Sequence, residues 1–322
     1  MSTPAIDIQG IVKRYENHVA VRSLSLNVPR GAVYGLLGPN GAGKTTTIRM
    51  MLNIIAPDEG AIRVLGLSHD DPTLVDRIGY LPEERGLYRK MQVRRVLQFL
   101  GELKGMPRGK VLDRAIDEWL ERLSLKTAGE NWGMAKVDEL SRGMQQKVQF
   151  IGALLHDPEL VILDEPFSGL DPINAQALKD TVLDLKQRGR TVIFSTHIMD
   201  NAERMCDSVC IIANGEKVLD GGVAEVRASH GARTIALGLE GTPSTAVNAV
   251  LRDQRLVSRM VHSDRYIELE KAPAATAQQV LHALVAANAP IDRFELVHPS
   301  LHRIFLEKVG ATNIEEGMSG HG

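Results

Sequence analysis

The sequence lacks the features that mark several common classes of protein. It has two cysteines, Cys206 and Cys210, too few for a disulfide framework, which favours a reducing compartment. The formal net charge of −2 gives no electrostatic reason to expect nucleic acid as a partner. No uninterrupted apolar run approaches the roughly 18 residues of a membrane-crossing helix, and the N-terminal MSTPAIDIQG lacks a signal-peptide pattern. If the protein works at a membrane, we expect another chain to cross it.

The 322 residues are more than a single hydrophobic core usually holds, so about two domains are expected. Stretches of β-branched residues at 5–12 and 21–28 predict short antiparallel strands. Apolar runs at 32–37, 160–163 and 191–195 have the pattern of strands buried on both faces. Together they predict an α/β core with a largely parallel sheet.

Helical patterns lie between these strands. Leu, Val, Ile and Trp spaced between charged residues predict a helical subdomain at about 90–155. Residues 45–55 predict a further helix, which Pro57 ends. The dipeptide at 214–215, Asn-Gly, predicts a two-residue hairpin turn between short apolar stretches.

A second, small α+β domain is expected in the C-terminal part. The composition changes at 221–231, GGVAEVRASHG, which predicts a linker between a domain at 5–222 and a domain at 232–310. The second domain shows the pattern order βαββαβ of a ferredoxin-like unit, with a terminal helix near 299–309. The polar, glycine-rich stretch 311–322 predicts a flexible tail.

A glycine-rich segment, GPNGAGKTT, fits the phosphate-loop pattern between a predicted strand and a predicted helix. Its glycines let successive backbone N–H groups turn inward, and the helix N-terminus favours an anion. We expect Lys44 to neutralise the β- and γ-phosphates of a nucleotide and the Thr45 hydroxyl to bind Mg²⁺. The expected nucleotide-binding residues of this segment are Gly38, Pro39, Asn40, Gly41, Ala42, Gly43, Lys44, Thr45 and Thr46.

An acidic pair follows the apolar strand VIL. Its position places Asp164 and Glu165 at the carboxyl edge of the sheet, where ligands bind in open α/β folds. Asp164 can hold Mg²⁺, and Glu165 can polarise the attacking water as a general base. Alone, such a pair would more simply be structural, but beside a phosphate loop the catalytic interpretation is favoured.

These segments together resemble the nucleotide-binding subunits of ATP-binding-cassette (ABC) proteins over about residues 5–222. The resemblance implies a P-loop NTPase core with an antiparallel β-subdomain and a helical subdomain. It implies ATP and Mg²⁺ as cofactors, and a homodimer in which two chains enclose two ATP molecules. In that dimer each ATP lies between the phosphate loop of one chain and the signature loop of the other.

Further site residues follow from the resemblance. LSRGM at 140–144 resembles the signature loop, so Ser141 and Gly143 are expected to contact the nucleotide of the partner subunit. His197 resembles the switch histidine that contacts the γ-phosphate. Tyr15 resembles the aromatic residue that stacks on adenine, although it could be only a strand-edge aromatic.

Three positions depart from the family pattern. Arg142 stands where the signature usually has glycine, and Met144 where it has glutamine. Glu83, within YLPEERGLY, replaces the glutamine that senses Mg²⁺ and water. A carboxylate can still bind Mg²⁺, so Glu83 is a candidate metal ligand or else a structural residue.

The segments YLPEERGLY, LSRGMQQKVQ and HPSLHRIFLEKVG resemble the sodium-export and drug-export (ABC-2 type) ATPases. That resemblance implies a subunit at the cytoplasmic face of the cell membrane, held there by a separate permease. Dimer closure on ATP would drive export of an ion such as sodium, a drug or another small molecule. One alternative is a non-transport ABC ATPase acting on ribosomes or nucleic acid. Another is a regulatory module whose C-terminal domain gates the ATPase.

Overall fold

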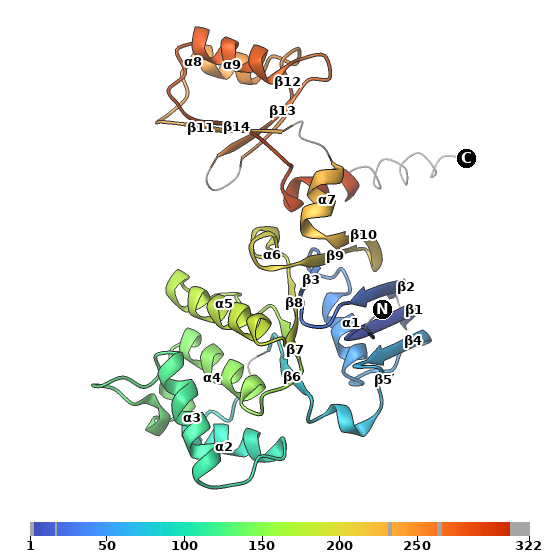
Figure 1. Ribbon diagram of the computed structural model, residues 1–322, viewed down its shortest axis with the longest axis vertical. Helices are drawn as coiled ribbons and strands as arrows, with labels where there is room; N and C mark the ends of the chain where they lie inside the picture. Colours follow the sequence, from blue (N-terminus) through green and yellow to red (C-terminus); the bar gives the residue numbers. More distant parts are fainter. Residues whose placement is uncertain (1–2, 17, 85, 231–233, 263–265, 310–322) are drawn as a thin grey trace. The chain divides into compact units, whose positions relative to one another are not determined.

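The chain forms two compact units (Figure 1). The first comprises Met1–Gly221 and the second Gly222–Gly322. The computed structural model describes residues 3–16, 18–84, 86–230, 234–262 and 266–309. The flexible tail expected at 311–322 therefore lies outside the described residues. Among the described residues, no helix combines the length and the apolar character needed to cross a membrane.

A six-stranded sheet forms the centre of the first unit. Its strands, in sheet order, are β10 (Glu216–Gly222), β9 (Ser208–Ala213), β3 (Val33–Leu37), β8 (Thr191–Thr196), β7 (Leu160–Asp164) and β6 (Ile78–Leu81). From β9 to β6 all neighbouring strands are parallel. Every residue of β3, β7 and β8 is buried, as their unbroken apolar runs predict.

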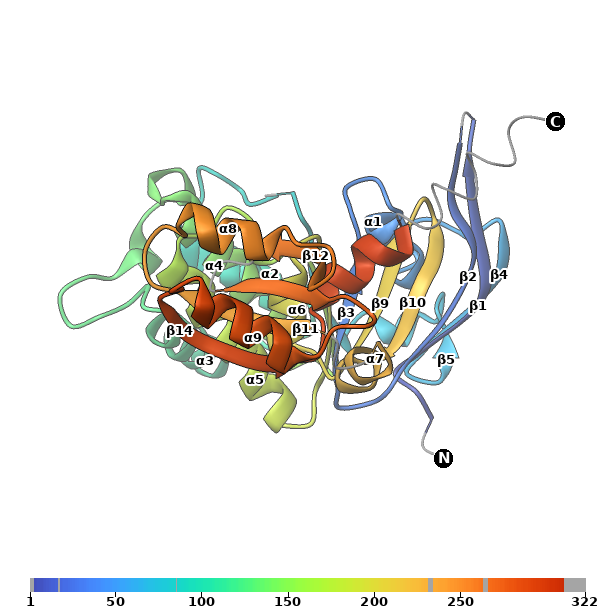
Figure 2. The same ribbon diagram turned by 90° about the horizontal axis from the view of Figure 1, so that it is seen from above.

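An antiparallel sheet lies beside this central sheet, and Figure 2 shows its strands β2, β1 and β4 side by side. Its order is β2 (His18–Val28), β1 (Ile6–Tyr15), β4 (Glu59–Val64) and β5 (Leu67–Ser68). One hydrophobic core holds both sheets and α1 (Lys44–Met51) together. Each fully buried large aliphatic side chain in such a core contributes about 1.5–3 kcal/mol.

Helix α1 is shorter than the sequence predicts, because it ends at Met51 and does not continue to 55. Asn53 takes the left-handed conformation with φ 53°. The N–H groups of Ile54 and Asn53 bond back to the carbonyls of Arg49 and Met50 at 2.9 and 3.1 Å. These two hydrogen bonds form a Schellman motif with Asn53 at the left-handed position, so the helix ends before it reaches Pro57.

The remaining described helices of the first unit follow β6, β7 and β8 along the chain. They are α2 (Val93–Leu103), α3 (Lys110–Arg122), α4 (Arg142–Leu154), α5 (Pro172–Gln187) and α6 (Met199–Met205), with short 3₁₀ turns at Pro72–Leu74, Trp132–Met134 and Val137–Glu139. Helix α2 contacts both α3 and α4. Their shared apolar face is fully buried, as at Val96, Ile116 and Val148. These three helices form the helical subdomain.

The second unit is a four-stranded antiparallel sheet with two helices packed on one face. Its strands are β11 (Thr234–Leu239), β12 (Val257–His262), β13 (Ile267–Lys271) and β14 (Ile291–Val297), and the helices are α8 (Thr245–Leu251) and α9 (Ala277–Ala286). The sheet order is β12-β13-β11-β14, and the element order is βαββαβ. This is the arrangement of a ferredoxin-like unit. A further helix spans 301–309.

Helix α7 (Val223–Ser229) occupies most of the stretch 221–231, where the sequence predicts a linker between the two domains. Gly222 precedes the helix as its N-cap, and Val223 and Val226 are buried on one face. Valines three residues apart are neighbours on a helix surface. The predicted linker stretch is therefore largely helical.

Candidate nucleotide-binding site

The loop between β3 and α1 is built so that glycine is required at two positions. Gly38 and Gly43 have φ of 152° and 103°. A Cβ atom would lie 2.1 Å from the Ile212 carbonyl oxygen at Gly38, and 2.4 Å from the Ala20 carbonyl oxygen at Gly43. Side chains at these positions would therefore force the loop away from β9 and β2. The close packing fixes the loop at the N-terminus of α1.

A pocket of about 480 Å³ lies elsewhere in the first unit, but the phosphate loop surrounds its own pocket of about 440 Å³. The lining of the second pocket is His18, Ala20, Asn40, Gly41, Ala42, Gly43, Lys44, Thr45, Thr46, Glu83 and Glu165. The predicted residues Gly38 and Pro39 do not line it. Their carbonyl oxygens instead accept hydrogen bonds from the Lys44 ammonium at 2.8 and 3.1 Å. These two residues therefore position the cation.

Lys44 carries a charge in a nearly water-free position. Its side chain is 6% exposed, and its Nζ lies 3.8 Å from Oε1 of Glu165. Burial lowers the pKa of the Lys44 ammonium, while the carboxylates of Glu165, Asp164 and Glu83 raise it. A phosphate would add opposing charge in a place where screening by water is weak. The pocket is therefore suited to a multiply charged anion.

Asp164 ends β7 and is fully buried. Its Oδ1 accepts a hydrogen bond from the Ser195 hydroxyl, and its Oδ2 has no hydrogen-bond partner. A buried carboxylate oxygen that accepts no hydrogen bond lowers the stability of the fold unless a cation binds it. The candidate Mg²⁺ ligands are Asp164, the Thr45 hydroxyl and Glu83. All three supply oxygen atoms, the ligand type that Mg²⁺ prefers.

The described residues hold no ready-made metal cage of three or more His, Cys, Asp or Glu side chains. A magnesium ion at Asp164 would therefore need phosphate oxygens and water to complete its shell. Mg²⁺ is commonly bound in this way, through one or two carboxylates and a nucleotide. The residues present fit the ion when nucleotide is bound.

Glu165 is turned toward the phosphate loop by an uncommon backbone conformation. Its φ is 48°, in the left-handed region, and its side chain is nearly buried. Its Oε1 lies 2.9 Å from Nδ1 of His197, which follows β8 and is partly exposed. Oε1 of Glu165 thus contacts both the Lys44 ammonium and the His197 ring. Non-glycine residues in this conformation cluster at functional sites.

Tyr15 lies at the end of β1, and its side chain is 45% exposed. Its ring stacks on His18, with centroids 5.6 Å apart and an angle of 25° between the planes. The two residues are directly paired across the β1–β2 ladder. Sequence reasoning missed His18, which lines the phosphate pocket. The strand register would have revealed it, because paired residues on one face lie close together.

Ser141 and Gly143 do not lie in the phosphate pocket of their own chain. Ser141 is the exposed N-cap of α4, where its Oγ accepts a hydrogen bond from the Met144 N–H at 3.2 Å. Gly143 packs against Asn174 of α5, whose Nδ2 would lie 3.0 Å from an added Cβ. Arg142 is exposed beside them. The structure therefore separates these residues from Lys44 within one chain.

Two polar side chains near the site were also missed. The Ser195 hydroxyl contacts both residues of the acidic pair. The Gln149 amide of α4 donates to the Glu84 carbonyl at 3.1 Å, which ties the helical subdomain to the segment that follows β6. Neither contact is visible in a local motif, because each joins elements distant in sequence.

Comparison with known proteins identifies the family of each part. Residues 21–168 match the family model described as ABC transporter. Residues 221–309 match the model described as ATP-binding protein DrrA1-3-like, C-terminal domain. The phosphate loop and the Asp164-Glu165 pair lie within the first match, and α7 to α9 within the second.

Curated relatives carry the same assignment. The chain is 40% identical over 306 residues to an uncharacterized ABC transporter ATP-binding protein, YhaQ, of Bacillus subtilis (strain 168), covering 95% of this chain and 99% of the relative. It is 36% identical over 253 residues to the Nod factor export ATP-binding protein I of Rhizobium sp. (strain N33), covering 78% and 81%.

Solved structures support the fold. An ATP-binding subunit of an ABC transporter superimposes with a TM-score of 0.63 and 30% identity, covering 70% of this chain and 93% of that chain. A dimeric, post-hydrolysis ATP-binding cassette bound to ADP and Pi gives 0.61 and 22%, a similarity of fold alone. The predicted fold class, a P-loop NTPase core with a small α+β domain, is confirmed. The chain belongs to the ATP-binding proteins of ABC transporters and is an ATPase.

Proposed function

We propose that this chain is the ATP-hydrolysing subunit of an exporter, and that closure of its homodimer on Mg²⁺ and ATP drives a separate membrane permease. The observation that carries the proposal is that Glu165, which lines the phosphate pocket together with Lys44, contacts both Lys44 and His197. The export role draws support from the Nod factor export relative. The relatives and structures described above are transporter proteins, which favours transport over a ribosomal or nucleic-acid role.

The residues divide the reaction between them. Lys44 binds and neutralises the terminal phosphates, and the loop N–H groups hold them in place. Glu165 accepts the proton of the attacking water. His197 contacts the Glu165 carboxylate and would contact the γ-phosphate of a bound nucleotide. Thr45, Asp164 and Glu83 would hold Mg²⁺, whose charge stabilises the β- and γ-oxygens when it is bound.

A second copy of the chain would complete each site. Ser141 and Gly143 lie outside the pocket of their own chain, and the Ser141 hydroxyl is exposed at the N-terminus of the 13-residue helix α4. Such an end presents free N–H groups and a favourable dipole to an anion. Ser141 and Gly143 are therefore placed to serve the nucleotide of a partner subunit.

The Glu83 carboxylate tests the proposed metal set. Glu83 is exposed and lines the phosphate pocket, where Gln would remove the charge and keep the size. We expect Glu83→Gln to raise the Mg²⁺ concentration for half-maximal ATPase activity about threefold or more, because a carboxylate binds Mg²⁺ more strongly than an amide does. The rate at saturating Mg²⁺ should change little.

The neighbouring Glu84 provides the control, since it is also exposed and does not line the pocket. Glu84→Gln should leave the Mg²⁺ titration unchanged. A Glu83→Gln titration that overlays the wild-type curve would remove Glu83 from the metal set.

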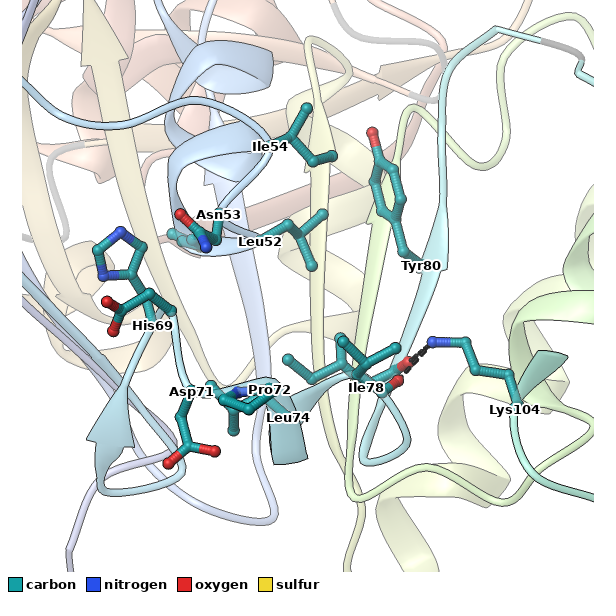
Figure 3. Close-up of a pocket in the computed structure, with 13 residues that line it drawn as sticks. Leu52, Asn53, Ile54, His69, Asp71, Pro72, Leu74, Ile78, Tyr80 and Lys104 are labelled. Atoms are coloured by element: carbon teal, nitrogen blue, oxygen red, sulfur yellow. Dashed lines mark hydrogen bonds between the residues drawn. The ribbon is translucent and has the colours of Figure 1, made fainter.

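A hollow of about 480 Å³ is the proposed docking site for the permease (Figure 3). Leu52 and Ile54, just after α1, and Tyr80 of β6 line it together with Leu74 and Ile78, as the close-up shows. Apolar surface hollowed in this way suits the side chains of a partner segment.

Charged side chains of both signs also line this hollow, namely Asp70, Asp71 and Lys104. Hydrogen bonds from Ser68 and Thr73 lower the pKa of Asp70 and Asp71 respectively, so both carboxyls stay charged near neutral pH. The complementary segment of the permease would place apolar residues in the hollow and a basic residue beside Asp70 and Asp71. β6 lines the hollow and leads directly to Glu83, which connects this docking site to the phosphate pocket.

A charge placed in the hollow should release the subunit from the membrane. Val75 lines the hollow and is 57% exposed. We expect Val75→Glu to reduce the fraction of the chain that sediments with cell membranes about tenfold, because docking of an apolar segment would remove the new carboxylate from water. ATP binding by the purified subunit should be unchanged.

Val285→Glu is the matched control, since Val285 of α9 is 58% exposed and lies in the second unit. Its membrane fraction should equal that of the wild type. Equal sedimentation of the two variants would contradict docking at this hollow.

A further inference from the structure

Ser195 is a fully buried hydroxyl that joins the two acidic residues of the site. Strands β7 and β8 are parallel neighbours, and Asp164 lies opposite Ser195 in their register. The Ser195 hydroxyl donates to Oδ1 of Asp164 and accepts a hydrogen bond from the Glu165 N–H at 3.1 Å. Ser195 and Asp164 are fully buried and Glu165 nearly so, so water does not compete for these contacts.

The first contact decides which oxygen of Asp164 is free. The carboxylate cannot rotate without breaking the hydrogen bond to Oδ1, and its Oδ2 has no partner. The serine donor therefore leaves one defined oxygen for a cation. Hydrogen bonds to the ligands of a metal orient those ligands and tune their affinity.

The second contact holds the backbone of Glu165. The left-handed conformation of Glu165 is unfavourable for any residue with a side chain. It therefore persists only where the surrounding structure fixes it. The hydrogen bond from the Glu165 N–H to Ser195 is one such restraint. His197, two residues further along the same chain, contacts the Glu165 side chain. The end of β8 thus holds Glu165 by its backbone and by its carboxylate.

We propose that Ser195 is a positioning residue that sets the orientations of Asp164 and Glu165 together, and so couples cation binding to activation of the attacking water. The proposal rests on the ATPase function proposed above. The role requires a group that donates and accepts at once, which a hydroxyl does and a methyl group does not. Threonine could replace serine, and alanine could not.

The test compares Ser195→Ala with Ser195→Thr. We expect Ser195→Ala to lower kcat about tenfold and to weaken Mn²⁺ binding to the ATP-loaded chain about tenfold, as loss of a ligand-orienting hydrogen bond does. Mn²⁺ binding is measured by electron paramagnetic resonance. ATP affinity without divalent cation should stay within about twofold, since Lys44 is unaffected. Ser195→Thr should restore both kcat and Mn²⁺ affinity.

A purely structural role has a different result. It would lower the melting temperature of Ser195→Ala and leave kcat and Mn²⁺ affinity at wild-type values, which overturns the proposal. Equal defects in the alanine and threonine variants would also overturn it. If Ser195→Ala does not fold, Ser195→Cys takes its place, because a thiol is a weak donor and acceptor of similar shape, and the same losses are expected. Failure of the ATPase function itself appears separately, as a wild-type chain without Mg²⁺-dependent turnover.

Discussion

Glu165→Gln is expected to bind ATP with an affinity near that of the wild type and to hydrolyse it more slowly by a factor of about 10² or more. The amide keeps the size of the side chain and cannot accept a proton at neutral pH. It also removes a negative charge 3.8 Å from the Lys44 ammonium, so the site still favours phosphate. The measurements are phosphate release and ATP titration of the purified chain.

The same variant should show how many chains make one site. If Ser141 of a partner completes the pocket, ATP that is bound but not hydrolysed keeps two chains together. The molecular mass of Glu165→Gln in solution should then be that of a dimer with ATP and that of a monomer without nucleotide.

Glu159→Gln is the matched control, because Glu159 immediately precedes β7 while Glu165 follows it. Glu159 is paired with Arg77 at 2.8 Å and does not line the phosphate pocket. Its variant should turn over ATP normally. Near-normal turnover in Glu165→Gln would remove the general-base role from this residue.

The parts of the fold that sequence predicts well are those whose signals are local. The unbroken apolar runs of β3, β7 and β8 show burial on both faces, and the spacing of the phosphate loop needs only nine adjacent residues. The resemblance to ABC proteins rests on such local motifs in order along the chain. The order of these motifs along the chain does not depend on the structure of the segments that connect them.

Elements decided by competing local signals were predicted less well. Pro57 gave a clear limit for α1, but the left-handed Asn53 stopped the helix earlier. The composition of 221–231 indicated a linker without showing its helix, although Val223 and Val226 are spaced for one. In both cases a weaker signal, adjacent to a stronger one, determined the structure.

The contacts of the site could not be read from local motifs at all. Ser195 acts on Asp164 because β8 lies next to β7, which the sequence order of the strands does not state. His18 reaches the pocket through its pairing with Tyr15. The left-handed turn at Glu165 follows from constraints on both sides of the residue. Each depends on which strands are neighbours.

Lys44→Met is expected to weaken ATP binding about 100-fold, measured by titration of the purified chain. Methionine fills the space of the buried lysine stem, so the change removes mainly the charge. A charge-assisted hydrogen bond contributes about 1.5–3 kcal/mol, which corresponds to roughly 10- to 100-fold in affinity. The upper value is expected because Lys44 is buried and screening by water is weak.

Lys186→Met is the control for removal of an ion-paired lysine, since Lys186 pairs with Asp207 at 2.6 Å and does not line the phosphate pocket. Its ATP affinity should be that of the wild type. An affinity of Lys44→Met within threefold of the wild type would contradict the assigned role of Lys44.

The double variant Lys44→Met, Glu165→Gln separates direct binding by Lys44 from the repulsion that its loss creates. In Lys44→Met the nearly buried Glu165 carboxylate loses its cation and opposes the incoming phosphates. Adding Glu165→Gln removes that repulsion, so we expect the double variant to bind ATP more tightly than Lys44→Met alone, by about tenfold. Strictly additive effects would mean that the two side chains act independently on the nucleotide. Tighter ATP binding by the double variant would show that Lys44 also neutralises the Glu165 carboxylate, which would otherwise repel a triphosphate. One contact would then serve both ATP binding and hydrolysis.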